Sequence, residues 1–106
     1  MTRPDNADDD LMRRRVERVA TVSALTARAL KLTQAAAGIE MDILRLEMEI
    51  VRNPANGQLV QELHDTENNA AAMREAQVDC AGDIAAAERE VADLDKLIAT
   101  TKGRMT

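Results

Sequence analysis

The chain has 106 residues, a net charge of −5, one cysteine and no Phe, Tyr or Trp. Aromatic side chains normally dominate the burial of a globular core, so their absence argues against an ordinary compact domain. A single cysteine excludes an intrachain disulfide and a cysteine-based zinc site. Apolar residues make up 45% of the chain and many of them are alanines, a composition typical of long helices packed side by side.

Residues 1–10 are polar and acidic, and we expect residues 1–7 to form a disordered N-terminal arm. They contain no apolar segment of the kind that a secretory signal requires, and no apolar run in the chain is long enough to span a membrane. A cytoplasmic protein without membrane insertion is therefore expected. Secretion by a system that uses no cleaved signal stays open.

The first helix is expected over residues 11–52, with Asp8, Asp9 and Asp10 as candidates for its N-cap. Apolar residues recur there in alternating steps of three and four, the spacing that keeps one seam of a helix facing a partner. This first seam consists of Val22, Leu25, Ala29, Leu32, Ala36, Ile39, Ile43, Leu46 and Ile50.

Two features of the first helix depart from this regular pattern. Met12, Val16 and Val19 lead into the seam with one shortened step, which predicts a locally overwound coil. Gly38 interrupts the helix at a cost of about 1 kcal/mol relative to alanine. We therefore expect a close backbone approach or a slight bend at that glycine.

Residues 53–57, with the sequence Asn-Pro-Ala-Asn-Gly, predict a turn. A second helix is expected over residues 58–101, with Gly103 as a candidate C-terminal cap and residues 104–106 as a tail. The hairpin domain thus covers residues 8–103. Its second seam consists of Leu59, Leu63, Thr66, Ala70, Met73, Gln77, Cys80, Ile84, Ala87, Val91, Leu94 and Ile98.

The two seams predict an all-α fold, an antiparallel two-helix coiled-coil hairpin. Setting Ile50 beside Leu59 also sets Ile39 beside Ala70 and Ala36 beside Met73, so large side chains meet smaller ones at several levels. Charge favours the same register. Residues 11–38 carry six basic side chains and one acid, whereas residues 71–101 carry seven acids and three basic side chains.

The turn resembles that of type III secretion needle subunits, which are also small helical hairpins. Asn53, Pro54, Ala55 and Asn56, followed by Leu59 and Leu63, carry this resemblance. It covers only the turn, Gly57 stands where that family usually repeats proline, and the tyrosines common in that family are missing. The helical-hairpin substrates of type VII secretion are similar in size, but their Trp-x-Gly turn is absent. We assign no family on these residues.

A second line of apolar residues at heptad spacing runs along the first helix beside its seam. This second stripe consists of Met41, Leu44, Met48 and Val51. Because one partner helix cannot cover two stripes, we expect a second copy of the chain or another helical protein to complete a four-helix bundle. Scattered apolar surface residues are the alternative interpretation.

Both helices carry excess negative charge beside the turn, which pairing within the chain does not explain. The tip acids Glu62, Asp65 and Glu67 on the second helix are therefore candidates for contact with a basic partner. A solvated acidic surface is the simpler interpretation.

No residue pattern indicates catalysis, a cofactor, a metal or a small-molecule substrate. His64 is the only histidine, and a catalytic pair with Cys80 would span roughly 24 Å of helix. Cys80 lies in the seam, where a free cysteine behaves as a small apolar residue. The basic cluster Arg13, Arg14, Arg15 and Arg18 could contact nucleic acid. The net negative charge and the lack of stacking aromatics argue against such contact.

These observations predict a non-enzymatic structural or adaptor protein, a subunit of a larger complex. The second stripe and the tip acids are its expected partner-binding residues. The alternative is a small regulatory module, a secretion-type chaperone or inhibitor that caps a helical or basic partner.

Overall fold

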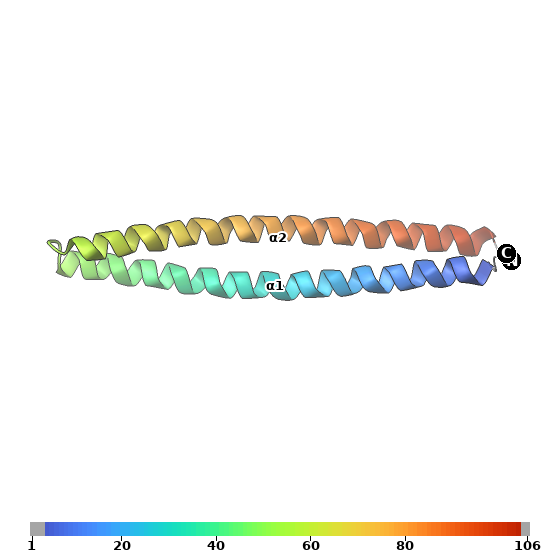
Figure 1. Cartoon of the computed structure of the whole chain (residues 1–106), viewed down its shortest axis with the longest axis horizontal. Coiled ribbons are helices and arrows are strands. Elements are labelled where there is room, and N and C mark those ends of the chain that lie inside the picture. The colour runs from blue at the N-terminus through green and yellow to red at the C-terminus, as the bar shows by residue number, and fades with distance from the viewer. Residues whose placement is uncertain (1–3, 105–106) are drawn as a thin grey trace. The chain divides into compact units, whose positions relative to one another are not determined.

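The computed structural model describes residues 4–104, with side chains for residues 7–104. They form two α-helices, α1 (Pro4–Arg52) and α2 (Gly57–Arg104), joined by residues 53–56 (Figure 1). The all-α class and the two-helix organisation predicted from the heptads are therefore confirmed. Neither helix, over its described length, is apolar enough to cross a membrane.

Helix α1 begins at Pro4, ahead of the expected start near Leu11. Proline suits a first helical turn because its fixed φ is already helical and its missing N–H would have had no partner there. Asp8, Asp9 and Asp10 consequently lie inside the helix and not at its N-cap. Residues 4–7 of the predicted arm are helical, and residues 1–3 lie outside the described part of the chain.

Helix α2 extends slightly beyond both of its predicted bounds, from Gly57 to Arg104. Gly103 therefore lies inside the last turn, and no glycine of the described chain has a positive φ, so the predicted left-handed cap is not present. The hydroxyls of Thr100 and Thr101 donate to the carbonyls of Lys96 and Leu97, each at 2.9 Å, within that helical end. Residues 105–106 of the predicted tail are not described.

The turn is held by hydrogen bonds at the two helix ends. The Asn53 amide donates to the Glu49 carbonyl at 2.9 Å and closes α1, and the Asn56 amide donates to the Asn53 carbonyl at 3.1 Å. The Asn56 side-chain Oδ1 accepts from the Gln58 amide at 3.1 Å, which makes Asn56 the N-cap of α2. Pro54 lies between the helices, where it interrupts neither ladder.

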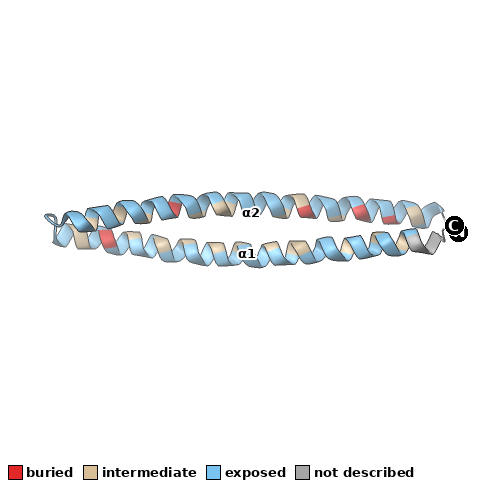
Figure 2. Ribbon diagram, in the orientation of Figure 1, coloured by how far each residue is buried: buried red, intermediate tan, exposed pale blue. Residues whose placement is uncertain are grey.

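The chain divides into two compact units. The turn unit is Arg28–Cys80, and the terminal unit combines Met1–Ala27 with Ala81–Thr106. In each unit a segment of α1 lies antiparallel to a segment of α2 (Figure 1). Buried residues are few and lie between the two segments, whereas the outer faces are exposed (Figure 2).

In the turn unit, every predicted seam residue is buried or half-buried. Leu46, Ala70 and Cys80 are the most covered, at 2%, 5% and 3% exposure. Thr66 is a polar seam residue. Its hydroxyl donates a hydrogen bond to the Glu62 carbonyl of the same helix at 2.7 Å, so it needs no partner on α1. The heptad pattern therefore predicts the contact face correctly here.

In the terminal unit, the residues predicted on α2 are again covered. Ala87, Leu94 and Ile98 are buried. Two ion pairs join the helices, one between Arg15 and Asp95 and one between Arg18 Nε and Glu90 Oε2 at 3.0 Å. These pairs lie within one residue of the predicted register.

The early part of α1 corrects one prediction. Met12, Val16 and Val19 are exposed, at 43%, 62% and 39%, so they do not form the seam. Leu11 and Arg15 are half-buried instead. The regular heptad thus continues back from Val22 through Arg18, Arg15 and Leu11 without a shortened step. Two of its positions are arginines that pair with acids of α2, which an apolar pattern does not reveal.

The close backbone approach predicted at Gly38 is not present, and the alternative of a slight bend stays a prediction. Beyond the nearby backbone of its own helix, no heavy atom lies within 4 Å of the position that a Cβ would occupy there. The glycine therefore serves no close approach between the helices, and its position on α1 would accept an alanine without steric conflict.

Candidate partner-binding site

The second stripe lies on the outer face of α1 in the turn unit. With 3.6 residues per turn, its centre lies roughly 150° around the helix from the seam. Met41 is 71% exposed, Leu44 61%, Met48 58% and Val51 81%. Within the turn unit α2 therefore covers the seam of α1 and leaves these four side chains in solvent.

A shallow hollow follows the stripe. It is lined by Met41, Leu44 and Met48 together with Arg45, Glu49 and Arg52. Arg45 forms ion pairs along α1 with Glu49 Oε1 at 3.2 Å and with Asp42 Oδ1 at 3.8 Å. The surface thus has an apolar floor with charged side chains at its edge, the arrangement expected of a protein-binding surface.

The tip acids do not join this surface. None of Glu62, Asp65 and Glu67 lines the hollow along the second stripe. Asp65 Oδ1 accepts a hydrogen bond from Gln61 Nε2 at 3.0 Å, and Glu67 lines a different hollow with Glu47 and His64. Glu62 and Asp65, three residues apart, lie on one side of α2, whereas Glu67 points to another side. The seven predicted site residues therefore form one apolar surface on α1, two acids on one side of α2 and a third acid on another.

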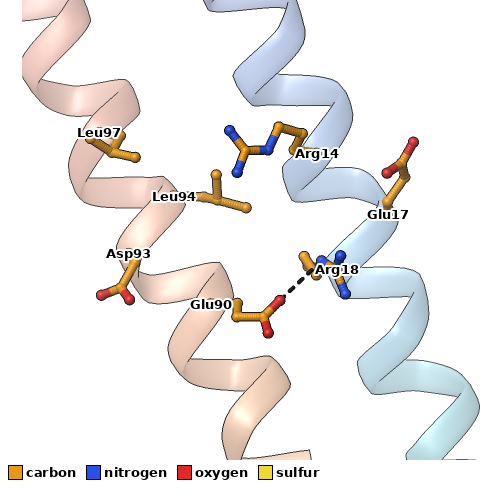
Figure 3. Close-up of a pocket in the computed structure, with 7 residues that line it drawn as sticks. All are labelled: Arg14, Glu17, Arg18, Glu90, Asp93, Leu94 and Leu97. Carbon is orange, nitrogen blue, oxygen red and sulfur yellow. Dashed lines mark ion pairs between the residues drawn. The ribbon is translucent and has the colours of Figure 1, made fainter.

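The basic cluster lies in the terminal unit, where acids of the same chain occupy most of it. Asp10 lies 2.7 Å from Arg13, and its hydrogen bond and charge raise the pKa of the Arg13 guanidinium. Arg15 and Arg18 pair with Asp95 and Glu90 of α2. Arg14 lines a hollow with Leu94 and Leu97, and the Arg18–Glu90 pair crosses that hollow (Figure 3).

The single histidine and the single cysteine lie in different surroundings. His64 is exposed, whereas Cys80 is buried in the seam at 3% exposure. Across the described residues, no group of three or more His, Cys, Asp and Glu side chains is placed to hold a metal ion.

The structure adds one apolar residue to this face that the sequence reasoning missed. Leu30 is 60% exposed and lies two heptads before Leu44, with Ala37 between them. Leu30 has heptad spacing relative to Leu44, but the small side chain of Ala37 between them interrupts the line of large apolar residues. The charged neighbours Arg45 and Arg52 were also missed, because the search for the stripe considered apolar positions alone.

Comparisons with known proteins assign no family to the chain. It matches no protein-family model, no curated protein and no solved structure. The function is therefore inferred from the surface of the molecule itself.

Proposed function

We propose that the chain is a non-enzymatic structural or adaptor protein that binds a helical partner through the second stripe. The observation that carries this proposal is the exposure of four large apolar side chains in one line on α1. Single exposed apolar residues are common on any protein. Four at heptad spacing along one helix face are the contact pattern of a coiled coil or helical bundle.

The accessible surface of the chain supports the same proposal. It measures 7901 Å², whereas a folded monomer of 11.6 kDa exposes roughly 5,800 Å². The excess, roughly 2,000 Å², is larger than the roughly 800 Å² that each partner buries in a standard protein–protein interface. Few side chains are fully covered within the chain, so a partner that covers the second stripe would add substantially to the buried apolar surface.

The bound state in this proposal has four helices, two from the chain and two from a helical partner, with a partner helix packed against the outer face of α1. Side chains of α1 would then contact α2 on one face and the partner on the other.

A photo-crosslinking side chain at Leu44 tests the proposal in cells of the source organism. The matched control carries the same group at Glu75, an exposed residue on the outer face of α2 in the same unit. We expect a discrete protein adduct from position 44 that is absent from position 75. Equal labelling from the two positions, or none from position 44, would contradict the proposal.

A further inference from the structure

The two borders of the second stripe carry opposite charges. Glu40 and Glu47 precede Met41 and Met48 and form the acidic border, whereas Arg45 and Arg52 follow Leu44 and Val51 and form the basic border. With 3.6 residues per turn, each border lies roughly 70° from the centre of the stripe, on opposite sides. All four charged side chains are exposed. The stripe is thus an apolar line between an acidic edge and a basic edge.

From this arrangement we propose that the stripe binds the same stripe of a second copy, with the two α1 helices parallel and in register. The inference rests on the function proposed above and identifies the partner. In this pairing Met41 and Met48 meet their own counterparts, as do Leu44 and Val51. The two-fold axis brings the acidic border of each copy against the basic border of the other.

The charges select the parallel orientation over the antiparallel one. In a parallel coiled-coil pair, the residue that precedes a core position such as Met41 or Met48 faces the residue five positions later on the partner helix. Glu40 then faces Arg45 of the second copy and Glu47 faces Arg52, and symmetry repeats both contacts. In an antiparallel pair the same borders would meet acid to acid and base to base. The antiparallel pair would therefore have repulsive contacts at its borders, where the parallel pair has four attractive ones.

The borders are available for this pairing. No ion pair of Glu40, Glu47 or Arg52 is found among the described residues, and Arg45 pairs only along its own helix, with its side chain 59% exposed. The seam of α1 faces away from the stripe, so the contact with α2 is kept when a second copy binds. Two heptads of contact are thus complementary in both apolar character and charge.

Charge exchange across the borders tests the proposal. Variant one carries Glu40→Arg and Glu47→Arg, and variant two carries Arg45→Glu and Arg52→Glu. We expect the wild type to dimerise and each variant alone to dimerise at least about tenfold more weakly. An equimolar mixture of the two variants, and a single chain with all four changes, should regain wild-type affinity. The control with Glu75→Arg and Glu88→Arg, two exposed residues of α2, makes the same change in charge as variant one and should dimerise as the wild type does.

A cysteine at position 51 tests the orientation. In the parallel pair the two copies of Val51→Cys lie side by side, so a disulfide dimer should form much faster than with Glu75→Cys. Equal rates for the two variants would overturn the parallel arrangement. The native Cys80 is buried, and a Cys80→Ala background removes its contribution.

The outcomes separate this inference from the proposed function. A wild type that stays monomeric, or border variants that dimerise as the wild type does, would overturn self-pairing. If position 44 still captured a different protein in the crosslinking experiment, the adaptor function would stand with another partner. If position 44 captured nothing, the function itself would fall.

Discussion

The two units use the same heptad spacing in different ways. In the terminal unit charge contributes to the contact between the helices, through Arg15–Asp95 and Arg18–Glu90. In the turn unit the contact is made by apolar and small residues such as Leu46, Ala70 and Cys80. The ion pairs found among the described residues of that unit join side chains of α1 only. Charged side chains therefore pair between the two helices in the terminal unit, whereas in the turn unit they remain on the outer surface.

Exposed apolar side chains show the same contrast. Those of the terminal unit include Met12, Val16 and Val19, which are interleaved with arginines that pair with α2. Those of the turn unit include the four large side chains of the second stripe, aligned on the outer face of α1. This difference is why the proposed partner contact is placed in the turn unit.

The largest expected effect comes from removing the most buried side chain of the turn unit. Leu46→Ala should lower the free energy of unfolding by about 2–5 kcal/mol, because it leaves a cavity in the contact with α2. Urea denaturation followed by circular dichroism measures this change. Leu97→Ala in the terminal unit, where leucine is 51% exposed, is the matched control and should cost much less. Equal losses for the two variants would contradict the assignment of the seam.

The next effect concerns the N-cap of α2, which positions the turn. Asn56→Ala should destabilise the chain by about 0.5–2 kcal/mol, because the Gln58 amide loses the side-chain oxygen that it donates to. Asn56→Asp keeps an acceptor at that position and should retain most of the stability. If both variants unfold at the wild-type urea concentration, Asn56 does not act as the cap.

Glycines in the two units offer a symmetric test. Gly38 lies in the turn unit and Gly82 in the terminal unit, and both have open space where a Cβ would be placed. Gly38→Ala and Gly82→Ala should each stabilise the chain by about 0.5–1 kcal/mol, because alanine loses less backbone entropy in a helix. Thermal unfolding of dilute samples measures both gains. A loss of stability at Gly38 alone would reveal a close contact there.

The smallest effect is the coupling between the helices of the terminal unit. A double-mutant cycle with Arg18→Gln and Glu90→Gln should give a coupling energy of about 0.2–1 kcal/mol, because both side chains are about half exposed to solvent. The coupling should decrease in 1 M salt, where charges are screened over about 3 Å. A coupling energy of zero at low salt would show that this ion pair does not help to set the register of the two helices.

Much of this fold could be predicted from heptad spacing and charge. Val22 to Ile50 and Leu59 to Ile98 identify the contact faces, and the turn follows from Pro54 between two asparagines. The start of α1 could not be found in this way, because no apolar periodicity reaches Pro4. The early seam was misassigned for a related reason. Arg15 and Arg18 occupy its positions, and a search for apolar residues chose Met12, Val16 and Val19 instead.

The candidate site was only partly predictable. The second stripe could be found because its four members are large and apolar. The tip acids were grouped by closeness in sequence, whereas the helix turns Glu67 away from the side that Glu62 and Asp65 share. The two charged borders are recognised only when the second stripe is given its own heptad register, in which Glu40 and Arg45 lie on opposite sides of the apolar positions.

The most direct test of the account is the solution mass of the wild-type chain, measured by multi-angle light scattering over a wide range of concentration. The account predicts a mass that rises from that of a single chain toward twice that value, with helicity maintained throughout. A mass of one chain at every concentration would contradict self-association through the second stripe.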